Sequence, residues 1–315
     1  MQVIHPLQSA AETLQNTVVA IGVFDGVHRG HQEILRQTVR EAQSQGLTPT
    51  ALTFDIHPGE LFAPEKSPQY IASVPQRAAL IDAYGGGIDV VAFVRFDQVF
   101  ASLSPNAFVT EILEGRLGAR HVLVGADFRY GWQRAGTVTT LLQAGAQCGF
   151  TVTVVPPILI HGERVSSTQI RGLITAGDLP AAVDLLGHPF VVEGTIGYGK
   201  QLGRTLGYPT ANLVPAQPNQ LLPGSGVYAA YAQLASDERV RAAVSVGTNP
   251  TTDTDGLRKV EAFLMDDFRS DLYGQPFALD FRFQVRNEQK FSGLDALVSQ
   301  MAADVSGIAD NLPHP

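Results

Sequence analysis

Short hydrophobic runs, rich in β-branched residues, recur through the first half of the chain and alternate with stretches of helical periodicity. After the first run, Ile34, Leu35, Val39 and Ala42 share one helical face. Runs that are apolar on both faces and are separated by helices predict a parallel sheet covered on both sides. The expected strands are residues 18–21, 50–54, 89–93, 121–124 and 151–155. We therefore expect an α/β domain.

The pattern changes at residues 186–189, beyond which short strands alternate with glycine and proline. This spacing of strands and turns is typical of a small antiparallel β-barrel. The expected strands are residues 190–199, 226–235, 241–247, 259–266 and 277–285. Near the end, Leu294, Leu297, Met301 and Val305 form one helical stripe, which predicts a terminal helix packed on the barrel. The sequence thus predicts two domains, residues 1–186 and 187–315.

Composition narrows the class of protein. The 315 residues are 44% hydrophobic and 17% charged, which is typical of a folded chain. The net charge of −8 disfavours a nucleic-acid-binding surface, because phosphate backbones attract basic faces. Cys148 is the only cysteine, which excludes an intrachain disulfide. The sequence shows neither a signal-peptide pattern nor an apolar run near the roughly 20 residues of a membrane span. We expect a cytoplasmic protein that binds neither membranes nor nucleic acids; its oligomeric state is left open.

Residues 18–35, VVAIGVFDGVHRGHQEIL, place a tight turn between a strand and a helix. The turn passes through Asp25, and the helix begins near His28. His28 and His31 are three residues apart and project from one face of the first helical turn. Gly30 lets a ligand approach the backbone between the two imidazoles. Because a helix start has free N–H groups and the positive end of the helix dipole, this turn is a candidate polyphosphate site.

Two other interpretations of these histidines remain open. They are compatible with solvated side chains at a helix start that have no chemical role. They are also compatible with a zinc site, although no further histidine or acidic residue stands at a telling local spacing.

The segment resembles the GxFDGxHxGH signature of nucleotidyltransferases, in the FAD synthetase branch. The match consists of Gly22, Phe24, Asp25, Gly26, His28, Gly30 and His31. Residues 53–58 (TFDIHP), 124–131 (VGADFRYG) and 165–171 (VSSTQIR) resemble later segments of that family in the same order. Ile56 departs from the pattern, because the family has proline there.

This resemblance implies a Rossmann-like domain that transfers an adenylyl group from ATP to FMN. It implies that His28, His31 and Arg171 stabilise the charge on the departing pyrophosphate, with Mg²⁺ helping. The further site residues that it implies are His57, Asp127, Ser166, Ser167 and Thr168. For the two serines and the threonine, simple capping of the following helix stays an alternative. Asp127 also has a structural alternative, as a residue of its turn.

A second candidate site lies in residues 194–213, where five glycines precede Thr210 and Asn212. Such glycine density lets a loop close over phosphates, although turns of a barrel use glycine as well. The order GRTLGYPTANL, residues 203–213, resembles the riboflavin kinase signature. Residues 226–230, 246–251, 260–266, 272–274 and 286–291 resemble later segments of that family.

The second resemblance implies that Thr210 and Asn212 bind Mg²⁺ and ATP phosphates, through the hard oxygen ligands that Mg²⁺ prefers. It implies that Glu261 deprotonates the terminal ribityl hydroxyl of riboflavin. A lone glutamate on a strand otherwise faces solvent without a role. The further nucleotide-binding residues implied are Gly199, Lys200, Gly203, Arg204, Gly207 and Arg286. Leu202 departs from the family, which often has a basic residue there.

Together the two resemblances imply a bifunctional enzyme that converts riboflavin to FMN and FMN to FAD with ATP. Three alternatives remain: an enzyme in which only the kinase works, a non-catalytic flavin sensor, and a transferase for another phosphorylated substrate. The first is motivated by Ile56. The full set of phosphate-site residues argues against the second, and the kinase signature behind the first domain argues against the third.

Overall fold

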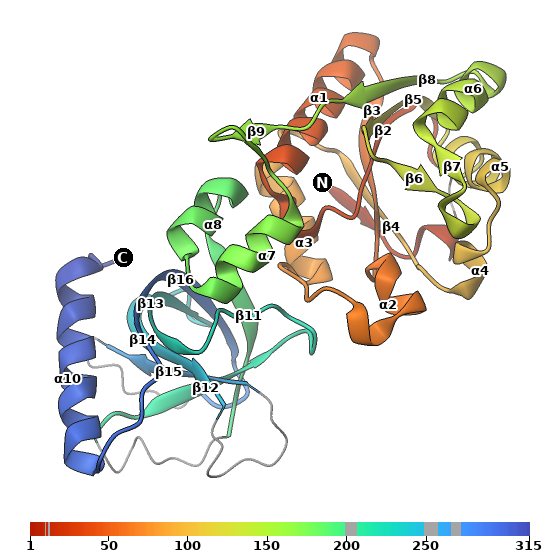
Figure 1. The fold of residues 1–315 in the computed structure, drawn as a ribbon. Helices are drawn as coiled ribbons and strands as arrows, with labels where there is room; N and C mark the ends of the chain where they lie inside the picture. Colours follow the sequence, from red (N-terminus) through yellow and green to blue (C-terminus); the bar gives the residue numbers. More distant parts are fainter. Residues whose placement is uncertain (10, 12, 199–206, 249–257, 266–271) are drawn as a thin grey trace. The chain divides into compact units, whose positions relative to one another are not determined.

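The computed structural model describes residues 1–9, 11, 13–198, 207–248, 258–265 and 272–315. The chain divides into two compact units (Figure 1). The first comprises Met1–Pro68 and Val74–Ser166, and the second comprises Gln69–Ser73 and Ser167–Pro315. Residues 167–186, which the sequence analysis assigns to the first domain, group with the second unit. The boundary between the functional domains at 186/187 stays a prediction.

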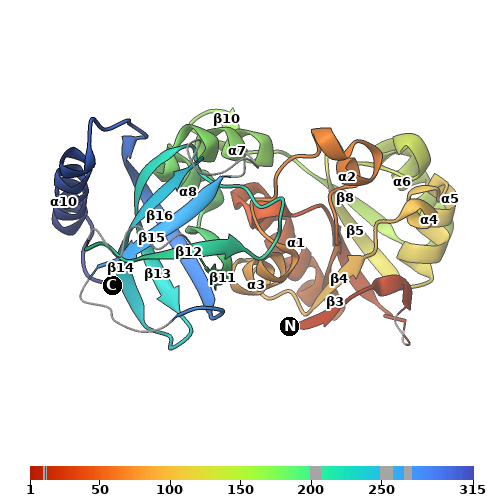
Figure 2. The same ribbon diagram turned by 90° about the horizontal axis from the view of Figure 1, so that it is seen from below.

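A six-stranded parallel sheet forms the centre of the first unit (Figure 2). Its order is β1-β4-β3-β2-β5-β8, and neighbouring strands are parallel throughout. The strands are β1 (Gln2–Ile4), β2 (Thr17–Ile21), β3 (Thr48–Phe54), β4 (Val90–Val94), β5 (Ala119–Gly125) and β8 (Thr151–Val155). The five predicted runs all form strands of this sheet, which confirms the α/β domain. The short β1 was not predicted.

Helices cover both faces of this sheet, because its strands are apolar on both faces. Helices α1 (Arg29–Gln45) and α3 (Val74–Tyr84) cover one face, where Leu35 and Ile81 join a core with Ala20. The π-helix η4 (Phe108–Glu114) and α6 (Val138–Cys148) cover the other, where Leu141 joins a core with Val19. The shorter elements of this unit are η1 (Leu7–Ser9), η2 (Asp25–Val27), α2 (Pro58–Phe62), η3 (Pro64–Lys66), α4 (Gln98–Ala101), α5 (Pro105–Ala107), η5 (Trp132–Arg134), and the strand pairs β6 (Arg129–Tyr130) with β7 (Gly136–Thr137) and β9 (Leu159–Ile160) with β10 (Glu163–Arg164).

The second unit contains a closed antiparallel barrel in the order β11-β12-β15-β14-β13-β16. The strands are β11 (Phe190–Gly197), β12 (Thr210–Pro215), β13 (Gly226–Leu234), β14 (Arg239–Gly247), β15 (Lys259–Leu264) and β16 (Pro276–Asn287). This confirms the predicted barrel.

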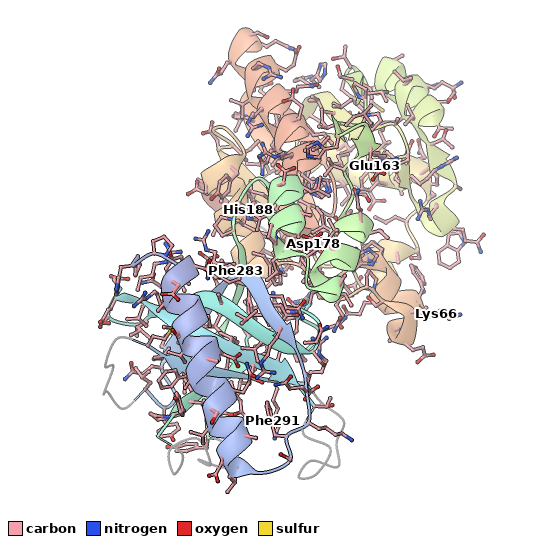
Figure 3. The ribbon with its side chains drawn as sticks, turned by 60° about the vertical axis from the view of Figure 1, so that its left-hand side comes forward. Lys66, Glu163, Asp178, His188, Phe283 and Phe291 are labelled. Carbon is pink, nitrogen blue, oxygen red and sulfur yellow. The ribbon has the colours of Figure 1, made fainter. Side chains whose placement is uncertain are left out.

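In the described part of the second unit, three helices accompany the barrel: α7 (Ser167–Ala176), α8 (Leu179–Leu186) and α10 (Leu294–Asn311). Helix α8 contacts β11 and β16. Helix α10 packs on the outside of the barrel, where Ile308 and Leu312 share a core with Tyr231 and Met265, as predicted for the terminal helix. Figure 3 shows Phe283 beside one end of α10 and Phe291 beside the other. Among the residues that the structure describes, no helix is both long and apolar enough to cross a membrane.

The strand order of the first unit locates its candidate site. The chain runs from β2 through β3 to β4 in one direction and then returns to β5 on the other side of β2. Ligands of open α/β sheets bind where the strand order reverses, at the carboxyl ends of the strands. The segments after β2 and β5 flank this point, and they contain His28 and Asp127.

Candidate functional site

The two histidines of the first turn form one stacked pair. His28 is the N-cap of α1, and its Nδ1 accepts a hydrogen bond from the backbone N–H of His31 (3.3 Å). The two rings stack with centroids 3.6 Å apart. Because Nδ1 of His28 is an acceptor, a neutral ring carries its proton on Nε2. The cap therefore fixes a tautomer that can donate to an oxyanion.

The turn before these histidines is tightly constrained by Phe24. This residue has a left-handed backbone (φ 50°) and a fully buried ring, which lies edge-on to His31 at 5.3 Å. A Cβ at Gly22 would lie 2.9 Å from the Phe24 ring, and one at Gly30 would lie 3.1 Å from the His28 ring. A side chain at Gly22 would therefore force the Phe24 ring to move, and one at Gly30 would crowd the His28 ring; neither contact was predicted from the sequence. Asp25 is buried in the same turn.

His57 repeats the geometry of His28 at the end of the next strand. It follows β3 as the N-cap of α2, and its Nδ1 accepts from the backbone N–H of Gly59 (3.0 Å). This bond again assigns the proton of a neutral ring to Nε2. Since β2 and β3 are parallel neighbours, His28 and His57 both lie beyond the carboxyl ends of adjacent strands.

Asp127 lies beyond β5, on the other side of the switch point. Its carboxylate accepts a hydrogen bond from Nη2 of Arg164 (2.8 Å), and this bond lowers the pKa of Asp127. Both side chains are more than half exposed, so we expect the pair to contribute little stability. Arg164 was not predicted as a site residue from the sequence. Ser166 follows β10 in this unit.

An aromatic cluster borders the same edge of the sheet. Phe96, which follows β4, packs against three other phenylalanine rings. The distances between ring centroids are 5.5 Å to Phe54, 6.3 Å to Phe62 and 5.6 Å to Phe100. Phe62 is 57% exposed although it is large and apolar. Phe128, next to Asp127, stacks on Tyr130 at 5.6 Å. Sequence reasoning did not name this cluster, although several of its phenylalanines stand close after predicted strands.

The first-unit site therefore combines imidazole N–H donors, the start of α1 and an exposed apolar surface. Such donors can stabilise charge that develops on phosphate oxygens. Among the described residues, no group of three or more His, Cys, Asp or Glu side chains is arranged to hold a metal ion.

Three predicted site residues, Ser167, Thr168 and Arg171, belong to the second unit through α7. The Nε of Arg171 donates to the backbone carbonyl of Gln69 in that unit (2.7 Å). Helix α7 begins at Ser167, which agrees with the position of a cap in this segment.

In the barrel, strand register brings three predicted residues together. Asn212 of β12 is directly opposite Glu261 of β15, and Thr210 is directly opposite Phe263. Directly opposite residues share a face, and so do residues two apart on one strand. Thr210, Asn212 and Glu261 therefore present their side chains on one face. All three are partly exposed, whereas Val260 and Ala262 on the other face are buried.

Arg286 is held inside the barrel unit. Its Nε and Nη2 donate to the Asp304 carboxylate of α10 at 2.8–3.0 Å, and its Nη1 donates to the Asn287 carbonyl. The side chains are 19% and 5% exposed, so this is a nearly buried ion pair. These contacts anchor α10 to β16; a nucleotide contact of Arg286 stays a prediction.

The remaining predicted residues of the second site lie in or beside the glycine-rich segment. Gly207 has a left-handed backbone (φ 83°), which favours glycine. Gly199, Lys200, Gly203 and Arg204 lie outside the described residues, as does Leu202.

Comparison with known proteins identifies relatives of both units. Residues 10–169 match the family model for FAD synthetase, and residues 186–312 match that for riboflavin kinase. A bifunctional riboflavin kinase/FMN adenylyltransferase of Escherichia coli K12 is 37% identical over 302 residues, covering 96% of this chain and 94% of the relative. One of Pseudomonas fluorescens is 37% identical over 306 residues, covering 97% and 96%. A crystal structure described as a macrolide-efflux protein from Streptococcus pneumoniae matches with a TM-score of 0.84 at 29% identity, over 99% of each chain.

Proposed function

The chain belongs to the family of bifunctional riboflavin kinases/FMN adenylyltransferases, and from this premise we propose which residues perform each reaction. The kinase reaction converts riboflavin and ATP to FMN and ADP. The adenylyltransferase reaction converts FMN and ATP to FAD and pyrophosphate. The FAD synthetase match covers the N-terminal part and the riboflavin kinase match the C-terminal part.

For the kinase reaction we assign the general base to Glu261. Its carboxylate would accept the proton of the terminal ribityl hydroxyl as the oxygen bonds to the γ-phosphorus of ATP and the bond to ADP breaks. The register that places Asn212 opposite Glu261 is the observation that carries this assignment. On this assignment, the Asn212 amide would lie beside the base where the phosphoryl group is transferred.

Thr210 and Asn212 are the proposed ligands of Mg²⁺ in the barrel. Their hydroxyl and amide oxygens share the face of Glu261, and hard oxygen donors suit this cation. When bound, Mg²⁺ would neutralise charge on the ATP phosphates.

For adenylyl transfer, no general base is required, because the FMN phosphate is already an anion. One of its oxygens would bond to the α-phosphorus of ATP while the bond to pyrophosphate breaks. We assign His28, His31 and His57 to phosphate binding. The support is the cap geometry, in which Nδ1 of His28 and of His57 accepts a backbone N–H and leaves Nε2–H as donor. Arg171 is proposed to bind the departing pyrophosphate.

We assign the flavin ring of the adenylyltransferase site to a wall formed by Phe62 and Phe96. The support is the exposure of Phe62, its contact with Phe96, and the position of Phe96 directly beyond β4. A large apolar side chain that is exposed beside a polar phosphate site is typical of a binding surface. We also propose the cytoplasm as the compartment, since both reactions consume ATP.

The test uses the purified full chain with riboflavin, ATP and Mg²⁺, followed by separation of the flavins. We expect Glu261→Ala to slow riboflavin phosphorylation by about 10²–10⁴-fold while supplied FMN is still converted to FAD. We expect His31→Ala to stop the pathway at FMN, with a loss of about 10²–10³-fold in the second step.

Two matched variants control for general damage. Glu193→Ala removes another strand glutamate of the barrel, and His161→Asn removes an exposed histidine of the first unit; both should keep the two activities. If Glu261→Ala or His31→Ala abolished both steps, the assignment of two separate sites would be wrong.

A further inference from the structure

The first nine residues contain β1, the outermost strand of the sheet, and the segment that follows its carboxyl end. The proposed flavin wall lies beyond the carboxyl end of the neighbouring strand, β4. Strand β1 pairs in parallel with β4, with Gln2 opposite Val90 and Ile4 opposite Ala92. His5 therefore follows the carboxyl end of β1, beside the carboxyl end of β4. This segment precedes residue 10, where the match to the FAD synthetase family model begins.

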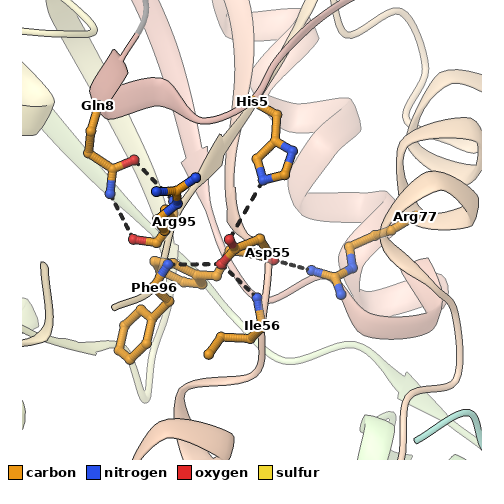
Figure 4. A network of polar contacts seen from close by, with 8 residues as sticks. His5, Gln8, Asp55, Ile56, Arg77, Arg95 and Phe96 are labelled. Atoms are coloured by element: carbon orange, nitrogen blue, oxygen red, sulfur yellow. Dashed lines mark hydrogen bonds and ion pairs between the residues drawn. The ribbon is translucent and has the colours of Figure 1, made fainter. Parts of the chain in front are cut away.

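Gln8 binds the backbone just beyond β4. Its side-chain amide donates to the carbonyl of Arg95 (2.7 Å) and accepts from the N–H of Arg95 (3.0 Å), as a paired strand would (Figure 4). Both backbone polar groups of Arg95 are therefore bonded to one side chain. This fixes the chain at the residue before Phe96.

Asp55 connects the loops that follow β3 and β4. Its Oδ1 accepts from the backbone N–H of Ile56 (2.9 Å) and from that of Phe96 (2.8 Å). Its Oδ2 lies 3.6 Å from Nε2 of His5 (Figure 4). The His5 ring is edge-on to the ring of Phe93. One carboxylate thereby binds two backbone N–H groups in adjacent loops, and His5 of the N-terminal segment lies next to its second oxygen.

The bond to Ile56 also bears on a departure from the family pattern. A proline at this position would restrict the backbone before His57 through its ring, but it would have no N–H. Ile56 has the N–H, and Asp55 binds it. The hydrogen bond can therefore supply the restraint on the His57 loop that a proline ring would otherwise supply.

We propose that Asp55 and Gln8, with His5 behind Asp55, are positioning residues for FMN adenylylation. They fix the backbone at Phe96 and at His57. The flavin wall and the imidazole of His57, which is proposed to donate a hydrogen bond to phosphate, are thereby held at a fixed separation. The proposal rests on the proposed function of Phe62, Phe96 and His57.

The test measures KM and kcat for FMN and for ATP in adenylylation, and the rate of riboflavin phosphorylation, on the full chain. Loss of hydrogen bonds to a charged acceptor predicts that Asp55→Ala raises the KM for FMN about tenfold, with the KM for ATP and the kinase rate within about twofold. Asp55→Asn should recover most of this loss, because its amide oxygen still accepts. Gln8→Glu, which loses the donor to Arg95, should raise the KM for FMN about threefold.

Thr17→Val is the matched control. It removes a buried hydrogen bond from the Thr17 hydroxyl to the Leu117 carbonyl. This bond lies at the amino-terminal end of β2, whereas the site lies beyond the carboxyl ends of the strands. It should lower stability without changing the KM for FMN. If Asp55→Ala lowered only kcat, or left the KM for FMN within about twofold, the proposal would be overturned.

A Phe62→Ala variant separates this proposal from the flavin wall itself. If Phe62→Ala raises the KM for FMN and Asp55→Ala does not, the wall stands and the positioning role is wrong. If only Asp55→Ala raises it, the positioning role stands through His57 and the wall is wrong. If neither raises it, both are wrong.

Discussion

The two sites are built by different kinds of geometry. In the first unit, the candidate residues follow the carboxyl ends of separate parallel strands and are held by individual bonds in loops, such as the caps made by His28 and His57. In the barrel, Thr210, Asn212 and Glu261 lie within strands, and the pairing of β12 with β15 sets their positions.

This difference predicts how each site responds to substitution. A site held by single side-chain bonds in loops can lose its geometry while the sheet below it stays folded. A site set by strand register keeps its geometry as long as the barrel is folded. Activity and stability should therefore separate in the first unit and change together in the second.

The largest expected effect tests the second unit. Asp304→Ala leaves Arg286 nearly buried without its carboxylate, which typically costs about 3–5 kcal/mol. Denaturant unfolding of the full chain should show this loss in the free energy of unfolding, and kinase activity should fall in parallel with the folded fraction. Asp310→Ala, at an exposed position of the same helix, should change stability by less than about 0.5 kcal/mol. Full kinase activity of the Asp304→Ala molecules that remain folded would support the claim that strand register alone sets the barrel site. A folded but inactive barrel would contradict that claim.

Two arginines offer a matched pair, one in each unit. Arg77 is fully buried, and its Nη1 donates to the Phe54 carbonyl (2.7 Å) and the Thr53 hydroxyl (3.3 Å). Arg258 has Nε and Nη2 buried without a hydrogen-bond partner in the part of the chain that the structure describes. Arg77→Met should therefore cost about 1.5–3 kcal/mol, because it breaks a charge-assisted bond at the end of β3. Arg258→Met should cost less, since its Nε and Nη2 make no hydrogen bond among the described residues. Equal losses in thermal or denaturant unfolding would contradict this reasoning.

A smaller effect on stability, with a larger one on activity, is expected at Gly22. The added methyl of Gly22→Ala would lie 2.9 Å from the Phe24 ring, so that ring must move. Overpacking of this kind costs about 1–2 kcal/mol where a ring can shift. Because Phe24 contacts His31, adenylylation should fall more than the folded fraction does, while phosphorylation of riboflavin stays unchanged. Gly172→Ala, on a helix with open space around it, is the control and should not destabilise. Parallel loss of stability and adenylylation in Gly22→Ala would remove the predicted separation.

The same contrast explains how much of the structure could be predicted from the sequence. Periodicity predicted five of the six strands in each sheet and the terminal helix, because apolar runs and helical stripes report directly on burial. It missed the short strands β1 and β12. The motif residues of the barrel were predicted from the family resemblance, and strand pairing then shows which of them share a face. The bonds made by Gln8 and Asp55 could not be predicted, because they join residues that are 87 and 41 positions apart. The partner of Arg286 was equally out of reach, since Asp304 resembles any polar residue of an amphipathic helix.

The smallest effect concerns the amino end of the first sheet, away from its site. His121 is buried between Thr151 and Thr153, and burial lowers its pKa below the ordinary value of 6.5; nearby Glu41 opposes this shift. The folded state thus favours the neutral ring, whereas the unfolded state takes up a proton near pH 6.5. Between that pH and the lower folded pKa, the unfolded state binds more protons, so the free energy of unfolding falls as the pH falls, by at most about 1.4 kcal/mol per pH unit. Unfolding measured from pH 7.5 to 5 should show this acid-side loss in the natural chain and a reduced loss in His121→Gln, with His161→Asn as the control. Adenylylation, corrected for the folded fraction, should be the same for His121→Gln and the natural chain at every pH, because the sheet can be loosened at this end without disturbing the bonds that hold the site. A selective rise in the KM for FMN would show instead that the two ends of the sheet are coupled.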